Sequence, residues 1–324
     1  MSIEQPVKSP RVSVVVPTYK RPTDLHRCLD ALSRQEFTDF EVLCVCREDD
    51  HETRKCVLQR AVNDCRFKQI IVDQPGAAAA YRRGFAAATG EFVSFTDDDA
   101  EAPPHWLATI VKHLDSHNEC GAVGGRDILQ LPLRRFSHPE VVKRVGSYSW
   151  SGKFHATHHC PIDAEFVRSD VIKGVNMTFR RELIRDLRIG DGLRSATGTL
   201  MGFEQGICYL VHRSDHQIHF LRDAWIKHYC APRKSDDNRT DMRSAHALET
   251  TFNHAYALWR YQPLMRAAVV HLRQIIIGSK HIPGIFRLPM CPGQTGVFLA
   301  HLPCAVSGAR AGVAAKASSK SPLA

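Results

Sequence analysis

The sequence predicts an α/β fold in which a mostly parallel sheet is flanked by helices, and three observations favour it. Strand-like segments alternate with helical ones, the strands are continuous apolar runs, and polar residues follow several strand ends. Ligands of such sheets bind beyond the carboxyl ends of the strands. Residues that lie far apart in the sequence are therefore expected to meet along one edge of the sheet.

The first half of the chain carries this alternation. Val12–Val16 is a β-branched run that ends at Pro17, as expected for a strand buried on both faces. A helix that can begin at Thr23 or Asp24 follows it. Further strands are expected at 40–46, 69–72 and 91–96, and further helices at 52–65 and 77–88, the second of them closed by Gly90.

The second half is less regular. Helices are expected at 106–117, 180–186 and 203–212, strands at 121–127 and 218–225, and loops with short strands at 131–163. Apolar residues at helical spacing from Ala247 to Ile277 predict a helical extension. We therefore expect an α/β domain at 1–235, a helical C-terminal extension at 236–306, and a disordered tail at 307–324 that is rich in Ala, Ser, Gly and Lys.

Composition and charge narrow the class of protein. The chain has a net charge of +9 without a single basic block, and no helix-turn-helix, zinc-finger or RNA-binding pattern is present, so a nucleic-acid partner is not expected. Phosphorylated substrates or an acidic membrane surface account better for the charge. The 11 cysteines show no disulfide spacing. The N-terminus has no signal-peptide core, and the apolar stretches near 267–270 and 275–277 are too short to span a bilayer, so a cytoplasmic location is expected.

Three consecutive aspartates, Asp97-Asp98-Asp99, follow the strand at 91–96. Clustered carboxylates raise one another's pKa unless a cation joins them, and their hard oxygens suit Mg²⁺ or Mn²⁺. Alternate residues of an extended segment point the same way, so Asp97 and Asp99 can face one ligand while Asp98 points elsewhere. The alternative is a solvated acidic turn that caps the next helix. The preceding buried strand favours a metal site.

Five stretches together resemble the family-2 glycosyltransferases, which have the GT-A fold. They span residues 11–235 in the order expected of that family, and they are Val12–Arg21, Gly90–Asp99, Lys173–Arg180, Glu204–Cys208 and His228–Arg233. The resemblance implies transfer of a sugar from a nucleoside diphosphate donor to a hydroxyl of a glycan or lipid-linked acceptor. It also implies Mn²⁺ or Mg²⁺ as cofactor.

The resemblance also implies roles for individual residues. Asp99 would ligate the metal, and His228 would complete the metal site. The donor site would be formed by Pro17, Thr18, Tyr19, Arg21, Asp50, Gly76, Arg83, Asp97, Asp98, Asn176 and Arg233. The family usually has an Asp-Gly-Ser type of turn where this chain has Arg47–Thr53, so the donor contact can come from Asp49 or Asp50. Asn176 has a structural alternative, a turn asparagine.

Glu204 is the candidate catalytic base. An inverting transfer needs one carboxylate to take the proton of the acceptor hydroxyl. Many relatives carry Glu-Asp at this helix start, whereas here the pair is Glu204-Gln205 and only Glu204 can ionise. The loop carboxylates Asp163 and Asp191 are alternative bases. A glutamate at a helix N-terminus can also be purely structural, because the helix dipole stabilises it.

Two further segments suggest ligands. His155–Cys160 contains the residue types that bind zinc, but no second ligand pair has suitable spacing. The segment 251–287 combines Trp259 and apolar residues with arginines, which favours either a helix packed on the catalytic domain or a peripheral membrane contact.

We therefore predict a metal-dependent inverting glycosyltransferase, with UDP-sugar as the favoured donor. A nucleotidyltransferase is the first alternative, but its glycine-rich phosphate loop with a lysine is not found at Pro17–Arg21. The second is a non-catalytic relative that binds a nucleotide sugar or a glycan. The complete triplet and Glu204 argue against it.

Overall fold

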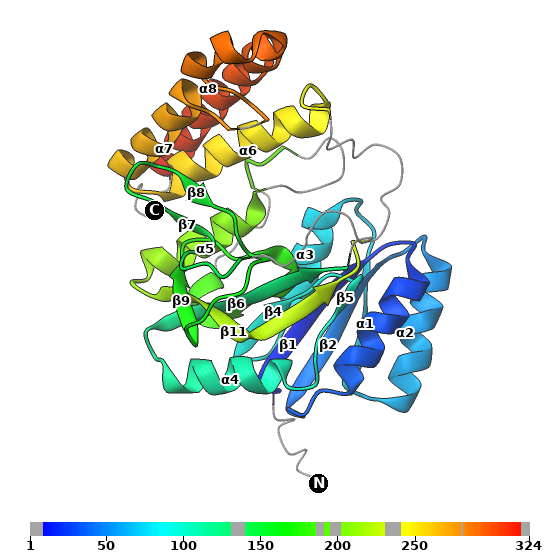
Figure 1. Ribbon diagram of the computed structural model, residues 1–324. Helices are drawn as coiled ribbons and strands as arrows, with labels where there is room; N and C mark the ends of the chain where they lie inside the picture. Colours follow the sequence, from blue (N-terminus) through cyan, green and yellow to red (C-terminus); the bar gives the residue numbers. More distant parts are fainter. Residues whose placement is uncertain are drawn as a thin grey trace.

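A computed structural model describes residues 9–130, 140–185, 191–194, 202–230, 241–279 and 281–318. The strands of its main sheet are β1 Val12–Thr18, β2 Phe40–Arg47, β3 Phe67–Val72, β4 Phe92–Phe95, β5 Ala100–Glu101, β6 Cys120–Leu129, β9 Phe166–Ser169, β10 Met177–Arg180 and β11 Gln217–His228. Within the described residues these strands are ordered β3-β2-β1-β4-β10-β6-β11-β5, with β9 also paired to β11 (Figure 1). The predicted α/β class is confirmed.

Four of the eight strand pairs in the described part of the main sheet are parallel, and their register brings the carboxyl ends of these strands together. β1 pairs in parallel with β2 and with β4, so that Val15 lies beside Leu43 and Phe95. β6 and β11 form a second parallel pair, while β10 runs antiparallel between β4 and β6. The segments after β1 and β4 therefore emerge at the same edge, as the sequence predicts for Thr18 and the aspartate triplet.

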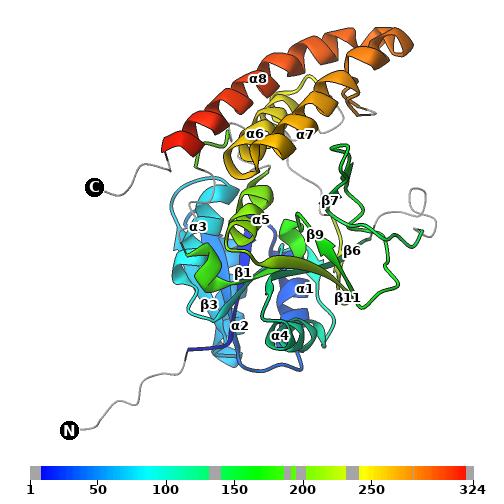
Figure 2. The ribbon, with the colours of Figure 1, turned by 90° about the vertical axis from the view of Figure 1, so that its left-hand side faces the viewer.

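Helices cover both faces of the sheet (Figures 1 and 2). They are α1 Pro22–Ser33, α2 His51–Asn63, α3 Ala77–Ala87, α4 Trp106–Ser116 and α5 Phe203–Arg213. α1 and α4 bury Leu29, Trp106 and other apolar residues against one face, whereas α3 and α5 pack on the other. A small hairpin, β7 Ser147–Tyr148 with β8 Phe154–His155, lies outside the sheet.

The C-terminal residues form a separate helical layer (Figure 2). It contains α6 Ala245–Tyr261, α7 Leu264–Ile276, the 3₁₀ helices η3 Ile285–Met290 and η4 Pro292–Gln294, and α8 Thr295–Ser318. α6 contacts α5 through the Gln205 Nε2–His254 Nδ1 hydrogen bond of 2.9 Å. The predicted helical extension is present, and the predicted boundary at 235–236 lies outside the described residues.

The sequence prediction differs from the structure at the C-terminus. A disordered tail was expected from 307, whereas α8 continues to Ser318. Gly308 and Gly312 explain the difference, because a Cβ at either position would lie 2.3 Å from the Phe252 carbonyl oxygen or 2.5 Å from that of Tyr256. Two glycines four residues apart allow α8 to pack closely on α6. Pro292–Ser318 is also long and apolar enough to cross a membrane by length and composition, contrary to the sequence expectation.

A second difference concerns the predicted helix at 180–186. Residues 177–180 instead form β10, and the 3₁₀ helix η2 Arg181–Ile184 follows it. Hydrogen bonding to β4 on one side and to β6 on the other determines this conformation, because tertiary pairing overrides the local helical pattern.

Candidate active site

Asp98 of the triplet is held from the end of β1. Thr18 Oγ1 donates a hydrogen bond of 2.8 Å to Asp98 Oδ2, and Arg21 NH1 lies 3.2 Å from Oδ1. Asp98 is buried, and burial raises its pKa to about 7 although Arg21 and Thr18 favour the charged form. The side chain of Asp98 therefore joins two strand ends, and alternation along the chain leaves its two neighbours to face elsewhere.

Asp97, Asp99 and His228 form a candidate metal site. Each offers one ligand atom, and these atoms all lie within 4.8 Å of one another. His228 Nε2 is 3.2 Å from Asp99 Oδ1, and Tyr81 Oη donates to Asp97 Oδ1 at 3.3 Å. The two carboxylates supply the hard oxygen ligands that Mn²⁺ and Mg²⁺ prefer, so the residues present fit the predicted cofactor.

A second layer behind this site was not predicted from the sequence. Asp127 at the end of β6 is fully buried, and its Oδ1 lies 3.1 Å from His228 Nδ1. Lys173 Nζ donates to the other oxygen, Oδ2, at 2.5 Å. Burial alone would lower the pKa of His228, but hydrogen bonds to Asp127 and Asp99 raise it to about 10. The position of Asp127 at the end of a buried strand is the only signal the sequence offers for it.

Glu204 begins the first turn of α5 and faces the same region. A Cβ at Gly174 would lie 3.4 Å from Glu204 Oε1, and the ring of Tyr81 packs 4.6 Å from that of Phe203. The pKa of Glu204 is raised to about 7, mainly by burial and in part by the carboxylate of Asp97, while Lys173 opposes the shift. A carboxylate with a pKa near neutrality is suited to act as a general base. By contrast, the alternative base Asp163 is exposed.

The predicted donor residues after β1 lie together. Tyr19 is partly exposed, and its Oη donates to Asp49 Oδ2 at 3.2 Å. Asp50 accepts from the backbone N–H groups of Lys20 and Thr53, which ties this loop to the start of α2. Arg21 reaches the triplet, and Thr18 and Pro17 end the strand. The structure thus brings these residues to the edge that carries Asp97, and their contact with a donor stays a prediction.

The remaining predicted donor residues are more scattered. Gly76 has a φ of 97° at the N-cap of α3, a backbone conformation that favours glycine. Arg83 is exposed and donates from Nε to the Ile71 carbonyl at 3.3 Å. Asn176 is buried, and its amide bonds Trp106 Nε1 at 3.1 Å and the Ala224 carbonyl at 2.7 Å, which favours the structural interpretation. Arg233 lies outside the described residues.

The histidine-rich tract at 155–160 forms no metal cluster among the described residues. His158 bonds the Val171 carbonyl through Nε2 at 2.8 Å, and burial lowers its pKa to about 4. Cys160 is buried as a free thiol. The tract lies beside β6, since the Asp127 N–H donates to the His158 carbonyl and Arg126 Nε to the His159 carbonyl, and it has a packing role there.

The order of the strands and the helices on both faces of the sheet define a class by fold, the proteins with a GT-A fold. Two solved structures resemble the chain. One is S. aureus TarS 1-349 in complex with UDP-GlcNAc, with a TM-score of 0.63, 15% identity, and coverage of 92% of this chain and 81% of that one. The other is the mannosyltransferase PcManGT of Pyrobaculum calidifontis with GDP-Man and Mn²⁺, with a TM-score of 0.50, 19% identity, and coverage of 98% and 77%. At these identities the likeness establishes the fold.

The family follows from the sequence comparison. The model of "Glycosyl transferase family 2" matches residues 13–187, more than half of the chain, and the chain belongs to that family. An uncharacterized glycosyltransferase of Nostoc is 31% identical over 121 residues, 37% of each chain. The GalNAc(5)-diNAcBac-PP-undecaprenol beta-1,3-glucosyltransferase of Campylobacter jejuni is 30% identical over 32% of this chain and 34% of its own. These matches span about a third of the relatives' length.

Proposed function

We propose that the chain is a metal-dependent inverting glycosyltransferase that moves a sugar from a nucleoside diphosphate sugar to a hydroxyl of a glycan or glycolipid. One observation carries the proposal. A cluster of Asp97, Asp99 and His228, suited to a divalent ion, lies at the same sheet edge as a carboxylate whose pKa is raised to about 7, that of Glu204. Metal ligands and a general base are the two parts such a transfer requires.

In the proposed reaction, Glu204 removes the proton of the acceptor hydroxyl as its oxygen bonds the anomeric carbon. The bond from that carbon to the diphosphate breaks at the same time, and attack from the opposite face inverts the configuration. Asp97, Asp99 and His228 would hold Mn²⁺ or Mg²⁺, with the proton of the His228 ring released to solvent on binding. The ion would stabilise the charge of the departing nucleoside diphosphate. Lys173 and Asp127 keep His228 oriented toward the site.

The partners of the reaction are proposed from the relatives. TarS was solved with UDP-GlcNAc and PcManGT with GDP-Man and Mn²⁺, and both support a nucleotide-sugar donor. UDP-sugar remains the favoured choice. The name of the C. jejuni relative specifies an undecaprenol-linked acceptor, which supports a lipid-linked acceptor here as well. A cytoplasmic enzyme in peripheral contact with the inner face of the membrane would meet such an acceptor.

Calorimetric titration of UDP, GDP and dTDP tests the donor site. Each nucleotide is added to the wild-type protein with and without Mn²⁺, and then to Asp99→Ala. Asp115→Ala is a matched control, because Asp115 pairs with Arg11 at 2.7 Å on the surface. We expect metal-dependent binding of one nucleotide, lost in Asp99→Ala and kept in Asp115→Ala. Binding that needs no metal, or that survives in Asp99→Ala, contradicts the metal assignment.

A transfer assay with the bound nucleotide's sugars then separates the enzyme from a non-catalytic relative. Release of the nucleoside diphosphate that depends on an added glycan or lipid-linked acceptor supports the enzyme. Nucleotide binding without any turnover supports the non-catalytic alternative.

A further inference from the structure

The C-terminal layer exposes large apolar side chains on α7, η3 and α8. On α7, Met265, Val269 and Leu272 are spaced along one side of the helix and point away from the buried Ala267 and Val270. Met265 is 79% exposed, and Phe286 on η3 is 75% exposed. The other exposed apolar residues of the layer are Leu264, Ile277, Ile285, Met290, Leu299 and Val313. A concentration of exposed apolar residues of this size marks an interaction surface.

Trp150 extends this surface from a distant part of the sequence. It lies at the tip of the β7–β8 hairpin and is 93% exposed. The tip touches α7, since a Cβ at Gly152 would lie 3.0 Å from Val270 Cα and 3.1 Å from the Val269 carbonyl oxygen. Tyr148 of the same hairpin packs with Leu258, Ala267 and Val270. We call Trp150 and the exposed apolar residues of α7, η3 and α8 the outer face.

The charge of the chain is concentrated in the same segment. Residues 250–324 contain eight of the 43 Lys and Arg residues and none of the 34 Asp and Glu residues, so they carry +8 of the net charge of +9. These cations form no continuous basic run, because Arg260, Arg266, Arg273, Lys280 and Arg287 are six or seven residues apart. Arg266 pairs with Asp170 from the α/β domain at 2.6 Å, but the segment itself has no acidic residue. Its remaining cations disfavour contact with a second copy and attract anionic lipid headgroups. Exposed tryptophan is typical of the membrane–water interface.

We propose that the outer face docks on the surface of an anionic membrane, with Trp150, Met265 and Phe286 entering the headgroup region. α8 lies on α6 through Gly308 and Gly312, so it belongs to the docked layer and does not cross the bilayer. α6 separates the outer face from α5, whose first turn holds Glu204. If the proposed transfer is correct, this arrangement presents the base to acceptors anchored in the same membrane. The docking itself does not depend on the reaction.

Vesicle flotation of the full chain tests the docking. Vesicles of phosphatidylcholine alone are compared with vesicles of equal parts phosphatidylcholine and phosphatidylglycerol, at low and high salt. The test variant is Met265→Glu with Phe286→Glu, and the matched control is Leu58→Glu with Val62→Glu on the exposed side of α2. We expect salt-sensitive binding to the anionic vesicles, reduced about tenfold or more in the test variant and unchanged in the control.

A fluorescence measurement gives a second readout. The difference in fluorescence emission between the wild type and Trp150→Phe reports Trp150. This emission should shift to shorter wavelengths when anionic vesicles are added. Equal binding to both vesicle types, or binding unaffected by the test variant, overturns the proposal. A dimer that the test variant dissociates would make the face a protein interface, and resistance to alkaline extraction would make α8 a membrane span. Both results also overturn it.

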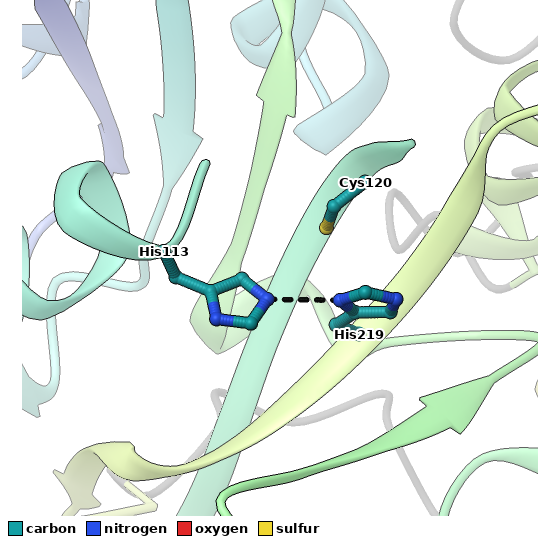
Figure 3. Close-up of side chains that lie close together, drawn as sticks. All are labelled: His113, Cys120 and His219. Carbon is teal, nitrogen blue, oxygen red and sulfur yellow. Dashed lines mark hydrogen bonds between the residues drawn. The ribbon is translucent and has the colours of Figure 1, made fainter. Parts of the chain in front are cut away.

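A separate cluster lies at the opposite end of β11 from His228. His113 of α4, Cys120 of β6 and His219 of β11 are all buried, and their ligand atoms lie within 4.8 Å of one another. Figure 3 shows the two imidazoles facing each other, with His113 Nε2 2.8 Å from His219 Nδ1 and the thiol beside them. Burial lowers the pKa of both histidines to about 4, so their rings are neutral at neutral pH.

The surroundings of this cluster orient its nitrogen atoms. Gln217 Oε1 lies 3.1 Å from His219 Nε2, and since this oxygen accepts only, the proton of His219 is on Nε2. The lone pair of His219 Nδ1 therefore faces the cluster. This is the arrangement of a metal-binding histidine whose second nitrogen is held by a neighbouring acceptor.

We infer that His113, Cys120 and His219 bind a zinc ion. Imidazole and thiolate are ligands of zinc, and Mg²⁺ has no preference for them. On binding, the thiol proton leaves to solvent and the Nε2 proton of His113 moves to its Nδ1, so the ion meets two neutral imidazoles and one thiolate. The ion would fasten α4, β6 and β11 together at the end of the sheet remote from Glu204.

Cobalt substitution tests this site, because a thiolate gives Co²⁺ a charge-transfer absorption that oxygen and imidazole ligands do not. The chain is reconstituted with Co²⁺ as wild type, Cys120→Ser and Cys230→Ser. Cys230 is the matched control, because it adjoins His228 at the predicted catalytic metal site. We expect an absorption that is lost in Cys120→Ser and kept in Cys230→Ser. Its absence from the wild type, or its persistence in Cys120→Ser, overturns the inference.

Discussion

The two ends of strand β11 hold histidines in opposite environments. His219 is fully buried beside a thiol and another imidazole, and its pKa is lowered to about 4. His228 is also largely buried, but two carboxylates lie against its ring and its pKa is raised to about 10. Burial is common to both, so the neighbouring charges decide whether the ring is neutral. The carboxylate end suits a hard ion, which would in turn attract a diphosphate, and the other end suits a softer ion held for stability.

The largest expected difference between the two ends is in turnover. Glu204→Gln should lower the rate of sugar transfer by about 10²–10⁴-fold, because general base catalysis contributes on this order. His219→Gln should change the rate by no more than about twofold from that of the wild type, because His219 lies at the end of β11 that is remote from the reacting atoms. Steady-state kinetics with saturating donor measure both. A similar loss in the two variants would mean that the ends are not functionally separate.

The next largest effect is expected in metal affinity, and it tests the role of Asp127. Asp127→Asn removes the negative charge that bonds the far side of the His228 ring. Loss of a residue that orients a metal ligand in this way lowers metal affinity by about 10–100-fold. We expect Mn²⁺ to bind more weakly by that factor, measured by titration followed by electron paramagnetic resonance. Gln217→Ala, which removes the corresponding partner of His219, should leave Mn²⁺ affinity unchanged. Equal effects of the two substitutions would contradict the assignment of Mn²⁺ to the carboxylate end.

The pH dependence of transfer should report Glu204. With a raised pKa of about 7, the carboxylate is protonated and inactive as a base below that pH and becomes active above it. The rate at saturating substrate should therefore rise about tenfold between pH 6 and pH 8. A profile that is flat through neutral pH, or that falls as the pH rises, would exclude Glu204 as the base.

The smallest effect concerns stability. His219→Leu keeps the approximate volume but removes the hydrogen bonds to His113 and Gln217. Loss of partners for buried polar groups costs about 1–3 kcal/mol of unfolding free energy. Thermal denaturation should show this loss while nucleotide binding stays as in the wild type. An unchanged melting temperature would mean that the cluster contributes nothing to the fold.

The sequence predicted the fold well and parts of the candidate site. Apolar periodicity identified most elements of the sheet, because buried parallel strands have a distinctive pattern. Adjacent strand ends brought Thr18 and Arg21 to the triplet as expected. Asp127 and Lys173 were missed, because an ion pair between strands and loops distant in the sequence leaves no local signal. Their effect on His228 arises only from tertiary packing.

The C-terminal layer was the least predictable region. A composition of Ala, Ser, Gly and Lys resembles that of disordered segments, yet Gly308 and Gly312 pack α8 on α6. The outer face was also hidden, because Trp150 and α7 are more than 100 residues apart in sequence and come together only in the fold. The predicted binding roles of Tyr19, Asp50 and Arg83 stay predictions.

The order of the elements along the chain has a consequence for biosynthesis. Every described residue of the proposed active site lies at or before His228, whereas α6, α7 and α8 follow it. Domains generally fold from the N-terminal side as they leave the ribosome. The sheet and α5 can thus fold before the helices with the most exposed apolar surface are synthesised. α6 then packs on a domain that is already folded. With this element order, the apolar outer face reaches solvent only after the sheet and α5 have been synthesised.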